Sequence, residues 1–305
     1  HAANERMSIM QVITDQVTVF SKDNKPCATA KPGEVLLFKT LDCFSNRIPD
    51  EQTTMADLDY SYGFANPAAG PVYIEGAEPG DVLVVDIFDV EVADEGTIAT
   101  DDHCGPLFET TGYRTKKIPI KDGMATFNEV SFPIDPMIGV IGVAPEGEPV
   151  NCGTPGKHGG NMDNTAIAAG ATLYFPVAVD GALFGCGDMH AVMGDGEVSV
   201  SGAEVAGYAT VTLTALPELS VPNPLIENDT HFGIIVSAES LDKAAELAVQ
   251  QMVDLLASRT NESEADLVML LSLVADVRVC QMVDPEKTVR FMVPKYVLDA
   301  IGFLL

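Results

Sequence analysis

The sequence predicts a mainly β or α+β protein, in which a β-sandwich or barrel is followed by a smaller α+β portion. Short apolar runs separated by Gly, Pro, Asn and Asp turns recur before Pro222, and no helical pattern alternates with them. After Pro222 the pattern changes to a strand, two helices and two further strands. We therefore expect a β-rich unit over residues 7–220 and an α+β portion over 221–305 that packs on it.

In the β-rich unit, the first predicted strands are short, and a long strand follows them. The apolar runs ITDQVTVF and EVLLF are separated by Asp-Asn-Lys-Pro and Lys-Pro-Gly, which favour turns. Residues 82–90 place apolar side chains on both faces of a strand, so the start of this strand should be buried on both sides. Residues 49–70 and 94–117 are polar and irregular, and we expect long loops there.

Several shorter strands follow, and one turn between them has a clear signature. Asp180-Gly181 is a residue pair typical of a two-residue type I′ hairpin turn. The shorter strands are predicted around residues 118–120, 138–143, 172–179, 183–184, 197–200 and 208–213.

The α+β portion contains two helices with recognisable N-termini. Ser240 is a suitable N-cap for a helix whose apolar residues recur at helical spacing. Ser263 and Asp266 form a capping pair for a second helix. Strands on either side of Asp284-Pro285 are predicted to complete this portion.

The composition is that of a folded and strongly acidic protein. Forty-five acidic residues against 17 basic ones give a formal charge of −28, which disfavours nucleic acid and anionic membrane surfaces as partners. We interpret most of this charge as solvated surface. No apolar run approaches the ~20 residues of a membrane-spanning helix. Six scattered cysteines without a C-x-x-C pair, and no pattern of a signal peptide, predict reduced thiols and a cytoplasmic location.

The densest group of reactive side chains lies within residues 183–204, LFGCGDMHAVMGDGEVSVSGAE. Asp188 and His190 are two residues apart, so they project from the same face of a strand. The Gly-Asp-Gly turn over 194–196 would bring Glu197 back towards them. Carboxylate and imidazole donors at a strand end predict a site for a hard or borderline divalent cation. The metal-capable side chains here are Asp188, His190, Asp195, Glu197 and Glu204.

A second loop carries glycines beside a histidine and an acid. In NCGTPGKHGGNMDN, His158 and Asp163 lie on either side of Gly159, Gly160 and Asn161. Paired glycines after a histidine suggest a tight loop that holds backbone amides near a ligand. Two Gly-rich loops with acids and histidines in one chain strengthen the prediction of a functional site.

Together these motifs resemble the acetamidase/formamidase family of amide hydrolases, over essentially residues 7–300. The segments that carry the resemblance are LDCFSNRI, GPVYIEGAEPGDVL, HGGNMD, GALFGCGDMHAVMGDGEV and VCQMVDPEKTVRFMVPK. The resemblance implies a jelly-roll-like sandwich with a smaller α+β part, assembled as a homodimer or higher homo-oligomer. It also implies hydrolysis of a short aliphatic amide, such as formamide or acetamide, to ammonia and the carboxylate. It further implies a divalent ion, zinc or calcium, in an acidic site.

The chemistry of amide hydrolysis agrees with this class. The reaction needs a nucleophile, a stabiliser of the oxyanion and an acid for the departing amine. The chain has no G-x-S-x-G motif, whereas a divalent cation that lowers the pKa of water from 15.7 towards about 7 can supply the nucleophile. One departure from the family pattern is Cys186-Gly187 before Asp188, which leaves the metal residues intact but can alter the pocket.

The residues that match the family can be given roles from the chemistry of the reaction. Glu197 is predicted as general base and acid, and His158 as an alternative metal ligand or a donor to the substrate oxygen. Asp195 is equally well interpreted as a builder of the Gly-Asp-Gly turn. The predicted substrate-binding residues are Gly159, Gly160 and Asn161. The predicted metal ligands are Asp188, His190, Asp163, Asp42, Asp195 and Glu204.

Two further groups have simpler interpretations than catalysis. Cys152 and Lys157 could belong to a nitrilase-like nucleophile set, but without the matching context we interpret Cys152 as a structural thiol. Asp101, Asp102 and His103 could ligate a metal, but we interpret them as a surface turn.

Two alternative functions remain open at this point. The same site could cleave a lactam or another linear C–N bond, because the pocket walls that decide the substrate are not visible in the sequence. The protein could instead be a non-catalytic β-protein that binds calcium. Calcium-only sites usually avoid imidazole, so His158 and His190 favour a catalytic, zinc-like centre.

Overall fold

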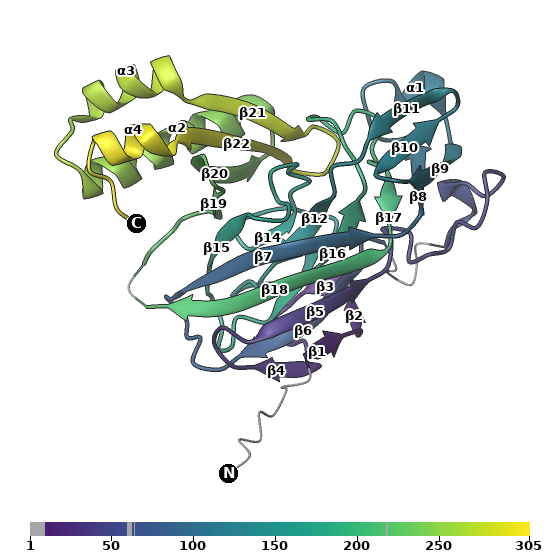
Figure 1. Ribbon diagram of the computed structural model, residues 1–305, viewed down its shortest axis with the longest axis horizontal. Helices are drawn as coiled ribbons and strands as arrows, with labels where there is room; N and C mark the ends of the chain where they lie inside the picture. Colours follow the sequence, from purple (N-terminus) through teal and green to yellow (C-terminus); the bar gives the residue numbers. More distant parts are fainter. Residues whose placement is uncertain (1–9, 60–62, 64, 218) are drawn as a thin grey trace, which may run out of the picture.

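The computed structural model describes residues 10–59, 63, 65–217 and 219–305, and it consists mainly of strands (Figure 1). Two large sheets contain nearly all of the strands in this part of the chain. The predicted mainly β, α+β fold is confirmed. Residues 7–9, at the start of the predicted β-rich unit, lie outside the described residues.

The nine-stranded sheet runs from the N-terminal strands into the C-terminal portion. Its order is β1 (Gln11–Ile13), β5 (Val35–Thr40), β18 (Gly207–Leu216), β7 (Val82–Val92), β15 (Thr172–Pro176), β19 (Leu225–Glu227), β20 (His231–Ala238), β22 (Lys287–Pro294) and β21 (Asp276–Gln281). Strand β19 pairs with β15 on one side and β20 on the other, so the sheet crosses the predicted boundary after residue 220 without a break. The division into two domains there stays a prediction.

The eleven-stranded sheet carries the candidate site. Its main path is β11 (Val130–Pro133), β10 (Met124–Phe127), β9 (Arg114–Lys121), β8 (Glu95–Thr100), β17 (Glu204–Val205), β16 (Phe184–His190), β12 (Met137–Gly142) and β14 (Gly159–Asn161). Off this path, β6 (Ala68–Ile74) pairs with β16, with β2 (Gln16–Val17) and with β4 (Ala28–Ala30). A separate pair joins β3 (Val19–Phe20) to β13 (Val150–Asn151).

The longer helices lie in the C-terminal portion. Helices α2 (Leu241–Arg259), α3 (Glu264–Val274) and α4 (Lys295–Ala300) pack beside β20 and β22 (Figure 1). The short α1 (Phe108–Thr111) and the 3-10 helix η1 (Met55–Asp57) lie between strands. Both predicted N-caps are confirmed, because the Ser240 and Ser263 side chains accept hydrogen bonds from the third residue after each. No helix in the described ranges is long and apolar enough to span a membrane.

The larger hydrophobic core lies between the two sheets. Phe38 of β5 and Phe184 of β16 are fully buried and meet edge to face, with ring centroids 5.4 Å apart. The start of the long strand β7 is buried on both faces, as predicted, since Val82, Leu83 and Val85 are each 0% exposed. A second core packs α2 and α3 against β20 and β22.

The prediction of a loop over residues 94–117 is wrong at both ends and holds only for residues 101–113, which contain no strand and only the short helix α1. Strand β8 and the first half of β9 lie there, in antiparallel register from Glu95 opposite Pro119 to Thr100 opposite Arg114. Strand β8 has the sequence EGTIAT, with a single large apolar side chain, so its hydrophobic pattern is weak. Its position between β9 and β17 supplies the hydrogen bonds that make it a strand.

Two other local predictions are also wrong. The predicted strand over 197–200 is a turn, because Glu197 and Val200 have φ angles of 49° and 87°, in the left-handed region that a strand excludes. The predicted hairpin at Asp180-Gly181 is a connection between sheets. Strand β15 before it pairs with β7 and β19, whereas β16 after it belongs to the eleven-stranded sheet.

We expect Phe184→Ala to lower the free energy of unfolding by about 3–5 kcal/mol, because it removes a fully buried ring that joins the two sheets. Urea denaturation followed by circular dichroism measures this loss. The matched control is Phe88→Ala, which removes a 59% exposed ring from β7 and should change the same quantity by less than about 0.5 kcal/mol. Equal losses for the two variants would contradict this account of the core.

Candidate metal centre

Strand β16 and its neighbour β17 bring three candidate residues to one face of the eleven-stranded sheet. Asp188 and His190 alternate with Met189, which packs in the core between the sheets. His190 lies opposite Glu204 of β17, so these two side chains share a face. Asp188 and His190 therefore project together, as their spacing predicts.

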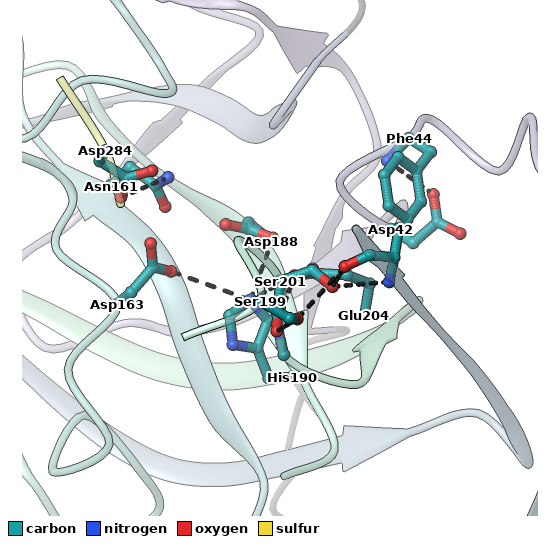
Figure 2. Close-up of polar contacts among 12 residues, drawn as sticks. Asp42, Phe44, Asn161, Asp163, Asp188, His190, Ser199, Ser201, Glu204 and Asp284 are labelled. Carbon is teal, nitrogen blue, oxygen red and sulfur yellow. Dashed lines mark hydrogen bonds and ion pairs between the residues drawn. The ribbon is translucent and has the colours of Figure 1, made fainter. Parts of the chain in front are cut away.

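The His190 imidazole lies among three carboxylates (Figure 2). Its Nε2 atom is 3.0 Å from Glu204 Oε1, 3.4 Å from Asp188 Oδ1 and 3.8 Å from Asp163 Oδ1. None of these four side chains is more than 3% exposed. Asp163 comes from the residues that follow β14, so the HGGNMD and GDMH motifs meet here, as the sequence predicts.

Donor atoms from other loops enlarge this cluster. In each of two groups of three buried side chains, one donor atom per residue lies within 4.8 Å of the other two. These groups are Asp163, His190 and Glu197, and Cys43, Asp188 and Glu204. Glu197 arrives from the turn after Gly194-Asp195-Gly196, whereas Cys43 arrives from the loop after β5 and was not predicted as a site residue.

Two glycines make room for the cluster. A Cβ atom on Gly139 of β12 would lie 2.6 Å from Asp163 Oδ1 and 2.7 Å from Asp188 Oδ2. A Cβ atom on Gly202 would lie 2.5 Å from His190 Nδ1. Any larger residue at either position would displace a donor atom. The sequence alone did not reveal these glycines, because their partners are distant in the chain.

The donor set fits a divalent cation. Buried oxygen and nitrogen atoms normally have hydrogen-bond partners, and leaving them without one is costly. In the cluster, seven such atoms have no hydrogen-bond partner among the described residues: Asp163 Oδ1 and Oδ2, Asp188 Oδ1, His190 Nδ1 and Nε2, Glu197 Oε2, and Glu204 Oε2. Carboxylate oxygens with one imidazole are ligands that zinc and other borderline cations accept.

Burial and the neighbouring charges together determine protonation in the cluster. Burial raises the pKa of Glu197 well above its ordinary value, and the nearby Asp163 carboxylate raises it further. Burial also raises the pKa of Glu204, with Asp188 adding to the effect. Burial disfavours the charged form of His190, but Glu204 and Asp188 outweigh it and hold the imidazole pKa well above normal. One imidazolium offsets only part of this negative charge. A divalent cation, bound with His190 as a neutral ligand, would offset two charges.

Asp284 is a site residue that the sequence analysis missed. It lies between β21 and β22 in the C-terminal portion, and Figure 2 shows it beside Asn161. Asn161 Nδ2 donates a hydrogen bond of 3.2 Å to Asp284 Oδ2, and the pKa of Asp284 is raised well above normal by burial and by Asp163. The segment VCQMVDPEKTVRFMVPK carries part of the family resemblance and contains this residue. This segment was the signal in the sequence that could have identified Asp284 as a site residue.

The structure places two predicted ligands differently from the others. Asp42 Oδ1 accepts hydrogen bonds from the backbone amides of Phe44 and Asn46, at 3.0 Å and 2.7 Å, so this oxygen stabilises the turn that carries Cys43 (Figure 2). Asp195 accepts two hydrogen bonds from the Arg290 guanidinium. Neither residue belongs to the two groups of donor atoms around His190.

His158 lies apart from these groups as well. Its ring packs edge to face on Phe20, at 5.4 Å between centroids, and lines a cavity of about 600 Å³ with Pro145, Pro155 and Pro222. Burial lowers its pKa to about 4, so the ring is neutral at neutral pH. Its predicted catalytic role therefore gains no support from its position.

The paired glycines next to His158 form strand β14. Gly159 and Gly160 have φ angles of 96° and 80° and lie opposite Gly142 and Ile141 of β12. The Gly159 amide already donates to Gly156 O, at 3.1 Å. These glycines shape the path towards Asn161, and the first of them does not present a free amide to a ligand.

The fold and the cluster together define a β-rich protein with a buried, acidic, metal-capable centre. The sequence profile of the acetamidase/formamidase family matches residues 14–152 and 149–300, and the chain belongs to this family.

Relatives of known name agree with this membership. The formamidase of Methylophilus methylotrophus is 25% identical over 66% of this chain and 65% of its own length, so the chain spans less than two thirds of that relative. A predicted acetamidase/formamidase of Thermoanaerobacter tengcongensis has a TM-score of 0.94 and 44% identity, over 97% of this chain and 99% of that one. An acetamidase of Bacillus halodurans has a TM-score of 0.93 and 41% identity, over 95% and 99%.

The buried neutral state of His158 predicts a dependence of stability on pH. The unfolded histidine takes up a proton near pH 6.5, whereas the folded one does so only near pH 4. The contribution of His158 to folding is therefore complete above pH 6.5 and is lost as the pH falls towards 4. We expect His158→Gln to reduce the loss of unfolding free energy between pH 6.5 and 4, by up to about 3 kcal/mol.

Urea denaturation at a series of pH values measures this difference between the variant and the wild type. The exposed residue His103 supplies the control variant His103→Gln. Parallel pH profiles for the wild type and His158→Gln would contradict the assignment of a buried, neutral His158.

Proposed function

We propose that the protein hydrolyses a short linear amide, of the formamide or acetamide type, to ammonia and the carboxylate, with a divalent cation as cofactor. Membership of the acetamidase/formamidase family supports the reaction class. The observation that supports the cofactor is the convergence of buried carboxylate and imidazole atoms that have no hydrogen-bond partner in the described part of the chain. Zinc is the favoured ion, because the central donor is an imidazole, and calcium is the alternative.

The cation would be held by His190 with carboxylates of the surrounding group. Asp163, Asp188 and Glu204 each place an oxygen within 3.8 Å of His190 Nε2. When bound, a divalent cation supplies positive charge that polarises an amide carbonyl and lowers the pKa of water. The pairing of β16 with β17 fixes Asp188, His190 and Glu204 relative to one another before the cation binds.

Glu197 is the residue to which we assign proton transfer during amide hydrolysis. It comes from a turn and not from the paired strands, and its Oε2 atom has no hydrogen-bond partner among the described residues. A carboxylate in this position can take a proton from the attacking water at Oε2 and deliver it to the departing amine. Its pKa, raised by burial, suits a group that both accepts and donates a proton near neutral pH.

The burial of the cluster supports a small substrate. Asp163, Asp188, His190 and Glu197 are at most 5% exposed, so a bulky chain has little access to them. A cleft of about 470 Å³ between residues 103–108 and 282–287 has Asp284 in its wall. Since Asp284 also contacts Asn161, this cleft is the approach that we assign to the amide.

We expect the protein to release ammonia from formamide or acetamide, and chelator to abolish this activity. Added zinc should restore the activity; restoration by calcium alone would assign calcium instead.

Asp188→Asn should weaken zinc binding at least about tenfold in calorimetric titration, because it removes a charged donor. Asp89→Asn, at an exposed position on β7, is the matched control.

Other outcomes of the activity assay would contradict the proposal. Cleavage of a γ-lactam but of no linear amide would assign the lactam alternative. A protein that retains calcium but cleaves neither substrate would be a calcium-binding β-protein.

We expect Glu197→Gln to retain the metal and to lower kcat by at least about 100-fold, because it removes the proton acceptor and keeps the shape of the side chain. Steady-state kinetics and elemental analysis of the same preparation test both parts. Glu91→Gln, at an exposed position on β7, should leave kcat unchanged. Wild-type kcat in Glu197→Gln would remove Glu197 from the mechanism.

A further inference from the structure

The turn that carries Glu197 is attached to the C-terminal portion through its backbone. The Gly196 amide donates to Cys280 O at 2.9 Å, and the Met282 amide donates to Gly196 O at 3.2 Å. Gly196 thus forms a parallel bridge with Gln281, at the end of β21. The residue immediately before the proposed base is therefore held by a strand about 85 positions later in the chain.

A partly buried ion pair strengthens the same attachment. Arg290 of β22 donates from Nη1 to Asp195 Oδ1 at 3.1 Å, and from Nη2 to Asp195 Oδ2 at 2.8 Å. The Arg290 side chain is 7% exposed and that of Asp195 is 34% exposed. A bidentate pair of this kind fixes orientation as well as distance, because the guanidinium is planar and its donors diverge at fixed angles.

The same carboxylate reaches the loop that carries Asp163. Thr165 Oγ1 donates to Asp195 Oδ1 at 2.8 Å, and Thr165 is two residues after Asp163. Asp195 therefore connects three segments: the turn before Glu197, the loop after Asp163 and strand β22. This position explains why a carboxylate is present within the Gly-Asp-Gly turn without belonging to either group of donor atoms around His190.

The backbone conformation of Glu197 requires an attachment of this kind. Its φ angle of 49° is a left-handed conformation that a non-glycine residue adopts only when its surroundings hold it there. Gly196 and Asp195, the two residues before it, supply those constraints through Gln281 and Arg290. If the guanidinium were removed, the turn could relax to a more extended conformation and withdraw the Glu197 carboxylate from Asp163 and His190.

We infer that Arg290 is a positioning residue: it holds Asp195, and through Asp195 it holds Glu197 in the geometry for proton transfer. Its effect on turnover rests on the proposed amidase function, whereas its effect on the conformation of the turn does not. The inference also gives the C-terminal portion a role in the site, since that portion supplies Arg290 and Asp284.

The test is chemical rescue of Arg290→Ala. We expect kcat to fall about 10- to 100-fold, because a base displaced by about 1 Å loses this much. KM and metal content should stay within about twofold of the wild type. Guanidinium ion at non-denaturing, millimolar concentration should restore part of kcat in a saturable manner. It should not stimulate the wild type.

The chain offers a matched control on the neighbouring strand. Arg278 of β21 lies directly opposite Arg290 in the register, but its side chain is 57% exposed and its ion pair with Asp276 spans 3.9 Å. Arg278→Ala should keep wild-type kcat and show no response to guanidinium. The melting temperature of Arg290→Ala is measured in parallel, because a general loss of folding would lower it. If that variant does not fold, Arg290→Lys replaces it, with a smaller loss of kcat expected because the charge remains.

Hydrogen exchange of residues 194–200 provides a readout that needs no activity. Exchange in this segment should be faster in Arg290→Ala than in the wild type and Arg278→Ala, and guanidinium should slow it again. Unchanged exchange together with wild-type kcat would overturn the inference, as would a loss of kcat that guanidinium does not restore. If the wild type hydrolyses no amide, the proposed function fails, and the exchange measurement alone still decides whether Arg290 holds the turn.

Discussion

The constraint on which the structure depends is the burial of several carboxylates around one imidazole. Asp163, Asp188, Glu197 and Glu204 surround His190 in a region from which water is largely excluded. Uncompensated buried charges of this kind cost several kcal/mol each, and a single imidazolium cannot offset all of them. The cluster is thus unfavourable for folding alone, and the divalent cation that we propose would offset part of this cost. The surrounding structure keeps these groups together in spite of their repulsion.

Strand alternation separates the groups that stabilise the fold from the groups that form the centre. Met189 packs in the core between the sheets, whereas Asp188 and His190, the residues on either side of it, project towards the cluster. The same strand therefore has its position fixed by apolar packing on one face and presents donors on the other. Gly139 of β12 contributes by leaving space where any side chain would meet the carboxylates. A site built on paired strands in this way is more rigid than one built from loops alone.

Sequence reasoning succeeded where the relevant interactions are local. The spacing of Asp188 and His190 predicted a shared face, and Ser240 and Ser263 predicted helix starts, since each depends on residues a few positions away. It failed where a distant segment decides the outcome. The turn at Asp180-Gly181 has the composition of a hairpin turn, but the strands around it pair with different sheets. Likewise, nothing near Asp195 or His158 in the sequence reveals that Arg290 binds the first and that Phe20 packs on the second.

The high negative charge of the chain has a separate origin from the cluster and a separate effect on the proposed reaction. Five acidic residues are buried among the described positions, against 45 in the whole sequence, so the acid excess lies mainly on the surface. A field of this sign neither attracts nor repels an uncharged amide, but it repels the carboxylate that hydrolysis produces. Such a surface would therefore leave substrate entry unaffected and favour departure of the anionic product. Because added salt screens surface charges, this effect would act on product release and would weaken as ionic strength rises.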